Sequence, residues 1–250
     1  MKKLTFDVAI TLLTAVLWVP ALLLCSLGIW LLEGRPILYV SRRRVFERRT
    51  IRLFKLRTMV RDAERVANRS TVPMDGTRFL NIPTDSPLYT PIGRFIERFH
   101  FTELPQLLHV LRGQMSVVGN RPLPENVIAA LREAYPNAED RFRVRCGLTG
   151  PTQLIGREEL GDDERLMLEI AYCHAVRRAY SMRLDFLVLL YTVLIALDLK
   201  PRLTVTDVLA LMRRYSGDLA PYDTVPQAGT KPASAPALAV GPGAERAAGV

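Results

Sequence analysis

The longest hydrophobic segment of the chain lies close to its amino terminus. Residues 8–32, VAITLLTAVLWVPALLLCSLGIWLL, carry no charged side chain. A helix that crosses a bilayer needs about 20 predominantly apolar residues, so this segment is long enough. A secretory signal peptide is the alternative, but the apolar part is too long for one and no small-residue cleavage site follows it. The pattern therefore predicts a membrane anchor over residues 1–33.

Two features of the sequence bear on the path of this anchor. Pro20 lies near its middle and removes a backbone hydrogen bond, so a kink is expected there. Basic residues flank both ends: Lys2 and Lys3 precede the segment, and Arg35 and residues 42–44 follow it. Because basic flanks stay in the cytoplasm, this pattern favours a helix that enters the bilayer and returns. The more basic carboxyl-terminal flank favours a bent helix that spans the bilayer, and the pattern alone leaves both paths open.

Beyond the anchor, the spacing of apolar positions predicts an α/β fold that is mostly helical. A short β-like run and a stretch of alternating apolar residues predict a small β-hairpin within residues 34–59. Helical spacing predicts helices over residues 60–68, 91–101, 103–111, 123–134, 162–180, 184–199 and 204–215. The apolar segment 184–199 is short for a span, so we expect it to pack in the core or lie in the membrane interface.

Glycine and proline divide the rest of the chain. They punctuate residues 70–90, which are predicted to form a loop, and the Arg112-Gly113 pair is typical of a helix end. Residues 218–250 are rich in Ala, Pro and Gly and are predicted to be a disordered tail. We therefore expect a single globular domain over residues 34–217 between the anchor and the tail.

Composition and charge narrow the range of partners. The 250 residues are 49% hydrophobic, which is typical of a globular or membrane-associated chain, and the net charge of +9 favours an anionic partner. The basic run over residues 42–52 lacks interleaved base-stacking aromatics, so no nucleic-acid partner is expected. Basic residues directly after a membrane segment meet anionic lipid, each with about 1 kcal/mol. Cys25, Cys146 and Cys173 match no metal motif and are expected to be reduced, as in the cytoplasm.

Four short motifs carry the candidate chemistry. They are KLRTM at residues 55–59, HFTELPQ at residues 100–106, VGNRP at residues 118–122 and CGLTGPTQLIGR at residues 146–157. Lys55 and Arg57, two apart in a predicted strand, point to one face and are suited to contact one diphosphate. In order and spacing, these motifs and the preceding apolar segment resemble the bacterial sugar transferase family, the monotopic polyprenyl-phosphate phosphoglycosyl transferases.

The resemblance implies a reaction and its ligands. It implies transfer of a sugar 1-phosphate from a UDP-sugar to polyprenyl (undecaprenyl) phosphate, which initiates exopolysaccharide, capsule or O-antigen synthesis. It implies Mg²⁺ as cofactor, bound by Glu103. It implies phosphate contacts from a set of cations: Lys55, Arg57, Arg98, Arg121, Arg143, Arg145 and Arg157. The resemblance also favours the re-entrant anchor. It places the protein in the bacterial inner membrane, with the globular domain in the cytoplasm. The further partners that it implies are membrane lipid, a second copy of the chain or downstream glycosyltransferases.

Two positions depart from the family pattern. The family has a nucleophilic Asp where Thr102 stands, and an Arg where Glu97 stands. Arg98 is one residue away and shares a helical face with Thr102 at i, i+4 spacing, so we expect it to reach the site. A threonine hydroxyl is a weak nucleophile unless a base activates it. Three interpretations stay open: Glu103 attacks the phosphate, Thr102 supports direct in-line transfer, or the protein is a catalytically silent homologue that acts as a membrane scaffold or partner.

Overall fold

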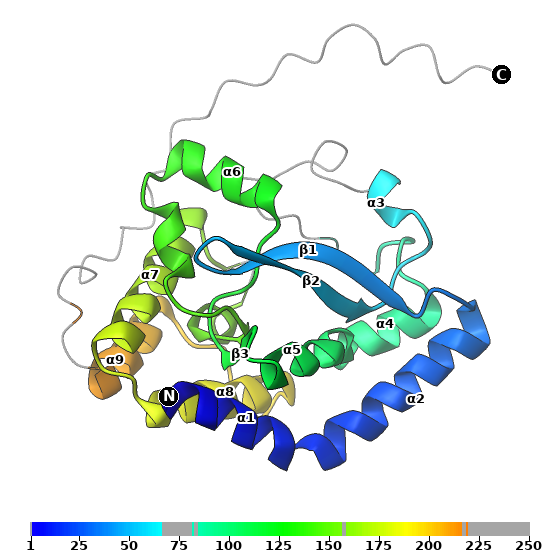
Figure 1. Ribbon diagram of the computed structural model, residues 1–250, viewed down its shortest axis with the longest axis horizontal. Coiled ribbons are helices and arrows are strands. Elements are labelled where there is room, and N and C mark those ends of the chain that lie inside the picture. The colour runs from blue at the N-terminus through cyan, green and yellow to red at the C-terminus, as the bar shows by residue number, and fades with distance from the viewer. Residues whose placement is uncertain (1, 67–81, 83–84, 157–158, 217–218, 220–250) are drawn as a thin grey trace, which may run out of the picture.

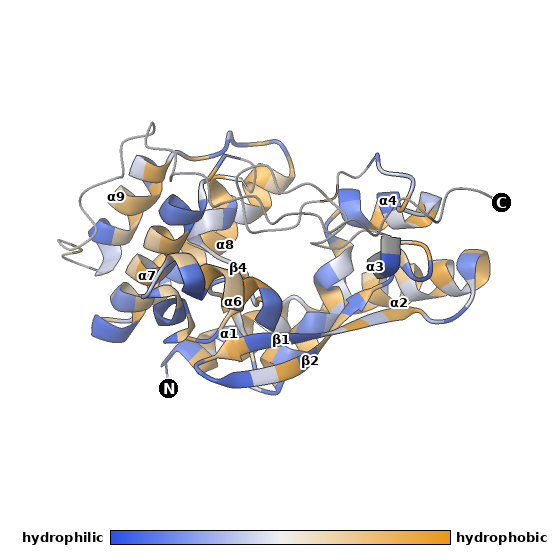
Figure 2. Ribbon diagram, turned by 90° about the horizontal axis from the view of Figure 1, so that it is seen from above, coloured by the Kyte–Doolittle hydropathy of each residue, from blue (hydrophilic) through white to orange (hydrophobic). Residues whose placement is uncertain are grey.

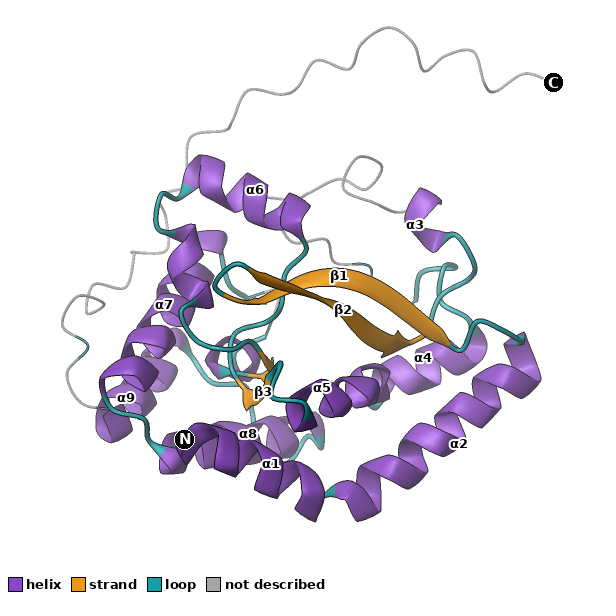
Figure 3. Ribbon diagram, viewed as in Figure 1, coloured by secondary structure: helices purple, strands orange, loops and turns teal. Residues whose placement is uncertain are grey.

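The computed structural model describes residues 2–66, 82, 85–156, 159–216 and 219. Within these ranges the chain is mostly helical, with one antiparallel hairpin and one short parallel pair of strands (Figure 3). The elements are α1 (Lys2–Leu13), α2 (Ala15–Glu33), β1 (Leu38–Phe46), β2 (Arg49–Leu56), α3 (Ala63–Val66), α4 (Pro91–Arg98), the 3₁₀ helix η1 (Phe101–Gln106), α5 (Leu107–Leu111), β3 (Ser116–Val118), α6 (Glu125–Ala134), η2 (Ala138–Phe142), β4 (Gly147–Thr149), η3 (Pro151–Leu154), α7 (Asp162–Arg178), α8 (Met182–Ala196) and α9 (Val205–Ser216). The predicted fold class, mostly helical with a small hairpin, is confirmed.

The amino-terminal apolar segment forms two helices, α1 and α2, that meet at a bend (Figure 1). The helix is interrupted at Thr14, six residues before the kink predicted at Pro20, and Pro20 itself lies inside α2. The Thr14 hydroxyl donates to the Ile10 carbonyl at 2.8 Å, and the Trp18 indole donates to the Thr11 carbonyl at 3.0 Å. Such side-chain bonds to the preceding turn compete with the helical ladder and bend helices.

Helix α1 packs against the globular part of the protein through buried polar contacts. Lys3 Nζ lies 2.6 Å from Asp185 Oδ2 on α8, and Asp185 has almost no solvent exposure. Asp7 is also buried, and its carboxylate accepts from the Ser116 hydroxyl at 2.8 Å and from the Val117 amide at 3.0 Å. Buried charges persist only when they are paired or hydrogen-bonded, so these contacts fix α1 to β3 and α8.

Helix α2 leaves the globular part and presents an apolar surface. It is the one helix in the described part of the chain that is long and apolar enough to cross a membrane, with a mean hydropathy of 2.3 and 17% of that window buried. Figure 2 shows hydrophobic residues along much of its length. Its carboxyl-terminal half returns to the protein, where Cys25 and Ile29 pack against Leu56 of β2 and Ile96 of α4. Both ends of the α1–α2 segment therefore contact the same body.

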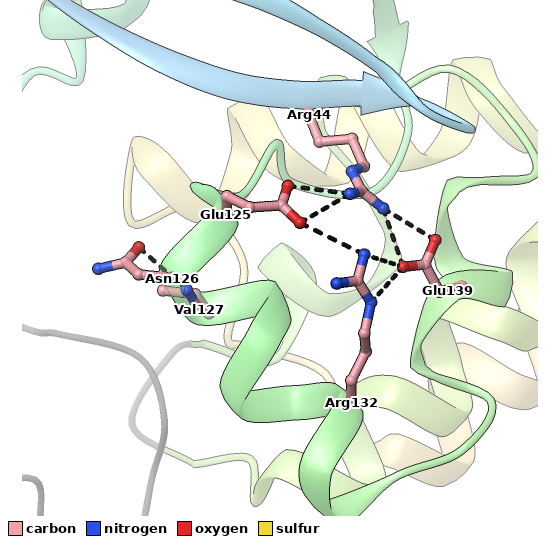
Figure 4. A network of polar contacts seen from close by, with 6 residues as sticks. All are labelled: Arg44, Glu125, Asn126, Val127, Arg132 and Glu139. Carbon is pink, nitrogen blue, oxygen red and sulfur yellow. Dashed lines mark hydrogen bonds and ion pairs between the residues drawn. The ribbon is translucent and has the colours of Figure 1, made fainter.

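The β1–β2 hairpin crosses the middle of the molecule (Figure 1) and is fixed near its turn by a charged network. Arg44 of β1 donates to Glu139 at 2.8 Å and to Glu125 at 2.8 Å, and Arg132 contacts the same two carboxylates (Figure 4). Two bidentate arginine–carboxylate pairs give this junction a defined geometry. The network joins the hairpin to α6 and η2, so the position of β2 is set by the rest of the domain.

The main core lies between the parallel pair β3–β4 and the helices α6, α7, α8 and α9. The two strands lie so close together that a Cβ atom on Gly147 would be 2.2 Å from the Gly119 nitrogen. Glycine at both positions lets the segment after β3 run against β4, with the Gly147 amide donating to the Asn120 carbonyl at 2.9 Å. This close pairing fixes the VGNRP segment.

Most predicted helices have a counterpart in the structure, with altered ends. The helix predicted over residues 91–101 stops at Arg98, and the one over residues 103–111 is a 3₁₀ turn followed by α5. Gly113 has φ 64° directly after α5, which confirms the predicted helix end. Helix α8 has a buried side at Leu184 and Val188 and an exposed apolar side at Phe186. The predicted tail at 218–250, apart from Leu219, and most of the predicted loop lie outside the described residues.

Candidate functional site

Three predicted site residues from distant parts of the chain form one cluster. Glu103 Oε1 accepts from Lys55 Nζ at 2.9 Å and from Arg121 Nη2 at 3.0 Å. Lys55, Glu103 and Arg121 come from β2, η1 and the segment after β3. Their side chains are 19%, 22% and 24% exposed, so the cluster is sheltered and still open to a ligand. Two cations on one carboxylate leave a local excess of positive charge, which suits a phosphate-bearing ligand.

The position of Glu103 follows from the short helix η1. Helix α4 runs from Pro91 to Arg98, and the hydroxyl of its N-cap residue, Thr90, accepts from the Gly93 amide at 3.0 Å. His100 then adopts a left-handed conformation with φ 57°, which turns the chain into η1. Pro105 lies inside η1 and lacks a backbone N–H, which favours a short tight turn over a long helix. The turn packs against β2 and α2 and thereby brings Glu103 to Lys55.

The position of Arg121 follows from a buried ion pair behind it. Arg141 and Glu169 are 0% and 2% exposed, and their side chains meet at 2.6 and 2.8 Å. The second guanidinium nitrogen of Arg141 also donates to the Arg121 carbonyl at 3.0 Å. The Asn120 amide donates to the carbonyls of Arg141 and Glu169 at 2.9 and 3.0 Å. The backbone of the Arg121 segment is thus held from η2 and α7, and its side chain is directed to Glu103.

The sequence interpretation missed Arg141 because it named the neighbouring arginines as phosphate ligands. The sequence shows one part of the Arg141 ion pair, because its partner, Glu169, lies in the helix predicted over residues 162–180. Only the fold shows that the two side chains meet.

Burial and charge act against each other at Lys55. Desolvation lowers the pKa of the Lys55 ammonium below its ordinary value, while the Glu103 carboxylate acts to raise it and Arg121 to lower it. The Glu103 contact therefore offsets part of the cost of placing an ammonium group here. An anionic ligand bound at Lys55 and Arg121 would offset it further.

Arg57 and Arg98 have other surroundings than those predicted. Strand β2 ends at Leu56, and the Arg57 guanidinium turns to the end of α2, where it contacts the Glu33 carboxylate and the carbonyls of Glu33 and Gly34, each at 3.2 Å. Lys55 and Arg57 therefore have different partners, Glu103 for Lys55 and the end of α2 for Arg57. Arg98 is exposed at the end of α4, and the break at His100 means that no continuous helical face joins it to Thr102.

The remaining predicted phosphate ligands lie outside this cluster or outside the described residues. Arg143 is exposed and pairs with Asp140 at 2.8 Å. The Arg145 guanidinium lies over the Phe46 ring at 5.6 Å, at the turn of the hairpin. Lys55 is six residues from the start of β2 at Arg49, about 20 Å along a strand, so Arg145 sits at the opposite end of the hairpin. Arg157 lies outside the described residues.

Thr102 has a partner that the sequence interpretation did not consider. Its hydroxyl donates a hydrogen bond to Glu97 Oε2, and Thr102 is buried, with 6% exposure. The turn at His100 folds the start of η1 back onto the last turn of α4 and makes this contact. Glu97 was regarded only as the loss of an arginine. The signal that could have identified it is the joint appearance of an acid and a hydroxyl at the two positions that depart from the family pattern.

The residues of the cluster fit a magnesium ion that is completed by its substrate. Mg²⁺ binds through oxygen ligands and uses one or two carboxylates together with substrate phosphates. Within the cluster, Glu103 is the residue whose carboxylate would hold the ion, and the other ligands would come from a bound phosphate group. Across the described ranges of the chain, no group of three or more His, Cys, Asp or Glu side chains gathers into a site made by protein alone.

The cysteines take no part in this chemistry. Cys25, Cys146 and Cys173 are free and buried, and burial raises the pKa of Cys146 and of Cys173 to about 12. A thiol with so high a pKa is not ionised at neutral pH and is a poor nucleophile.

Comparison with known proteins identifies the class of protein that this fold and cluster define. The sequence profile of the bacterial sugar transferase family matches residues 1–198. The chain therefore belongs to the bacterial sugar transferases.

Individual relatives carry more specific names. An undecaprenyl-phosphate glucose phosphotransferase of Komagataeibacter xylinus is 36% identical over 202 residues, which is 77% of this chain and 35% of that protein. The exopolysaccharide production protein ExoY of Sinorhizobium fredii is 29% identical over 197 residues, which is 77% of this chain and 84% of that protein. An undecaprenyl-phosphate galactose phosphotransferase of Salmonella typhimurium is 28% identical over 68% of this chain and 36% of its own length. The chain thus spans about a third of the length of two of these relatives and most of the third.

Proposed function

We propose that this protein transfers a sugar 1-phosphate from a UDP-sugar to undecaprenyl phosphate, with release of UMP. The single observation that carries the proposal is the cluster in which Lys55 and Arg121 converge on Glu103. Phosphoryl transfer depends chiefly on positioning and on stabilisation of negative charge, and the cluster supplies two fixed cations for it. The names of the relatives described above support undecaprenyl phosphate as acceptor. The name of a further relative, the UDP-glucose:undecaprenyl-phosphate glucose-1-phosphate transferase of Klebsiella pneumoniae, supports a UDP-sugar as donor. The product would initiate an exopolysaccharide, capsule or O-antigen.

In this proposal the chain's own residues bind and orient the diphosphate. Lys55 acts as a point contact, and the planar guanidinium of Arg121 acts as a directional one. When the donor binds, its phosphate oxygens take over cation contacts that Glu103 now holds, which frees the Glu103 carboxylate. A bound Mg²⁺ would then be held by Glu103 and would offset charge on the two phosphates.

We propose that the lipid acceptor reaches this site along α2. Helix η1 packs directly against α2, and the exposed rings of Phe95 and Phe99 lie on the neighbouring helix α4 and its end. We propose that the α1–α2 segment is re-entrant: α2 lies in the inner membrane, and both the start of α1 and the end of α2 lie at the cytoplasmic face. The start of α1 and the end of α2 both contact the same globular domain, which supports this path. A polyprenyl phosphate in the same leaflet would then present its phosphate at the level of Glu103.

The test is a transfer assay with the full chain in membranes. UDP-glucose and UDP-galactose, labelled in the β-phosphate, are supplied with undecaprenyl phosphate and Mg²⁺, and labelled lipid and UMP are measured. We expect both products in equal amounts, loss of both with Glu103→Gln, and loss of both when EDTA removes the metal ion. Exposed Glu133→Gln on α6 is the matched control and keeps the rate. Absence of labelled lipid with each of a panel of UDP-sugars would refute the proposal.

A second candidate function is a catalytically silent homologue that acts as a membrane scaffold or as a partner of an active transferase. The observation that favours it is Thr102 at the position of the family's nucleophilic Asp. The same assay separates the two candidates. An inactive wild-type protein that gains turnover in Thr102→Asp would establish the silent role.

A further inference from the structure

Thr102, which directly precedes Glu103 in η1, pairs with Glu97 at the end of α4. The Thr102 hydroxyl donates to Glu97 Oε2, and Thr102 is nearly excluded from solvent. The pair depends on the turn between α4 and η1, where the His100 amide donates to the Glu97 carbonyl at 3.0 Å and His100 has φ 57°. Because the backbone itself connects the two residues through this turn, their contact is fixed before any ligand binds.

The two acids of the site have different partners and are therefore suited to different tasks. Glu103 faces two cations, Lys55 and Arg121, on one of its oxygens. Glu97 faces the hydroxyl of Thr102. A hydroxyl within hydrogen-bond reach of a carboxylate is the arrangement of an activated nucleophile and its base.

We propose that Thr102 is the nucleophile of this enzyme and that Glu97 is the general base that activates it. The inference rests on the proposed function and names its attacking atom. Thr102 Oγ1 attacks the β-phosphorus of the UDP-sugar, its proton passes to Glu97 Oε2, and the bond from that phosphorus to the bridging oxygen breaks. UMP leaves with the electron pair of that bond. The sugar phosphate remains on Thr102 as a phosphodiester.

The second half of the reaction reverses the proton transfer. A phosphate oxygen of the polyprenyl phosphate attacks the same phosphorus, and the bond between that phosphorus and Thr102 Oγ1 breaks. Glu97 returns its proton to Oγ1 as the threonine leaves. The products are UMP and a polyprenyl diphosphate sugar, and both side chains regain their starting states. No co-reactant is needed, and the carboxylate that the family places at position 102 is replaced by a hydroxyl with its base at position 97.

The first experiment measures the chemical step in variants of the pair. We expect Glu97→Gln to lower kcat by about 100-fold or more, the range for loss of a general base, with KM for the UDP-sugar changed less than threefold. Thr102→Val, which keeps the shape and removes the hydroxyl, is expected to lose turnover, and Thr102→Ser to keep it within about tenfold. Glu133→Gln is again the matched control. A Glu97→Gln enzyme with the wild-type kcat overturns the inference.

The second experiment uses the wild-type protein and so does not depend on the folding of a variant. The full chain in membranes is incubated with UDP-sugar labelled in the β-phosphate, without lipid acceptor, and the labelled peptide is identified by mass spectrometry. We expect the sugar phosphate on Thr102, resistant to neutral hydroxylamine, as a phosphodiester is and an acyl phosphate is not. Label on Glu97 or Glu103, removed by hydroxylamine, or an active enzyme without any adduct, overturns the inference and leaves the proposed function standing. A wild-type protein inactive with every UDP-sugar overturns both.

Discussion

The contact between Lys3 and Asp185 provides a direct test of how the amino-terminal segment is held. Lys3 Nζ lies 2.6 Å from Asp185 Oδ2, and it donates to the Val118 carbonyl at 2.8 Å. The Tyr172 hydroxyl donates to the other oxygen of Asp185 at 2.8 Å. If this network fixes α1 to the globular domain, Lys3→Met destabilises the protein because it leaves the Asp185 carboxylate buried without its cation.

The expected size follows from the burial of the two side chains. Removal of one partner of a buried pair costs about 3–5 kcal/mol. Asp185 is 1% exposed but Lys3 is 18% exposed, so water reaches the ammonium side and the lower end, about 3 kcal/mol, applies. For a domain of this size, each kcal/mol shifts the melting temperature by about 2–4 °C, which gives a decrease of roughly 6–12 °C.

The assay is thermal unfolding of the purified chain in detergent, with Lys2→Met as the control. Lys2 is exposed and loses the same charge, so its variant is expected to stay within about 0.5 kcal/mol of the wild type. The double variant Lys3→Met/Asp185→Asn removes the unpaired charge and keeps an acceptor for Tyr172, so it regains part of the loss. Equal melting temperatures for Lys2→Met and Lys3→Met would refute the reasoning.

Three further predictions concern the membrane path, the helix contacts and the hairpin junction. Single cysteines introduced at the exposed positions Lys2 and Arg48 flank the α1–α2 segment, and a re-entrant anchor leaves both on the cytoplasmic side. We therefore expect both to react with an impermeant thiol reagent from that side only, and the buried native cysteines to contribute little background. Reaction of the two positions from opposite sides would contradict a re-entrant anchor. Gly93→Ala places a Cβ 1.9 Å from the Thr58 carbonyl oxygen, which is a steric clash with backbone. We expect the free energy of unfolding to fall by about 1–3 kcal/mol. An unchanged melting temperature would show that α4 shifts freely. Desolvation raises the pKa of Glu139, but hydrogen bonds from two arginines outweigh it and hold the pKa below its ordinary 4.5. Its contribution is therefore present above pH 4.5 and lost as the pH falls through the folded pKa, so Glu139→Gln is less stable than the wild type at pH 7 and equally stable in strong acid.

Local patterns in the sequence account for much of the fold. Alternation of apolar residues identified the hairpin, helical spacing identified α6, α7, α8 and α9, and Gly113 marked a helix end. These features depend on neighbours in the chain, which is why they are visible in it. The bend at Thr14 was missed because a proline six residues later is the stronger general signal for a bend. In the structure the break coincides with the hydrogen bond of the Thr14 hydroxyl and with the packing of α1 on the domain.

The candidate site was predictable in its composition and less so in its contacts. The grouping of Lys55, Glu103 and Arg121 followed from the family motifs, and the structure places the three together. The partners of Glu97 and Arg141 depend on a left-handed turn and on a contact between segments 28 residues apart. Periodicity and motif spacing carry no information on such contacts, so neither the Thr102–Glu97 contact nor the Arg141–Glu169 contact was predicted.

The end of β2 links the apolar helix α2 to the candidate site. Lys55 is the last cation within the strand and contacts Glu103, whereas Arg57 lies just beyond the strand and contacts the last turn of α2. A guanidinium at a helix carboxyl terminus stabilises the exposed carbonyls there, and Arg57 binds the carbonyls of Glu33 and Gly34. One rigid strand end therefore fixes both the end of the apolar helix and the acid of the site. If α2 lies in the membrane as proposed, its depth therefore sets the depth of Glu103.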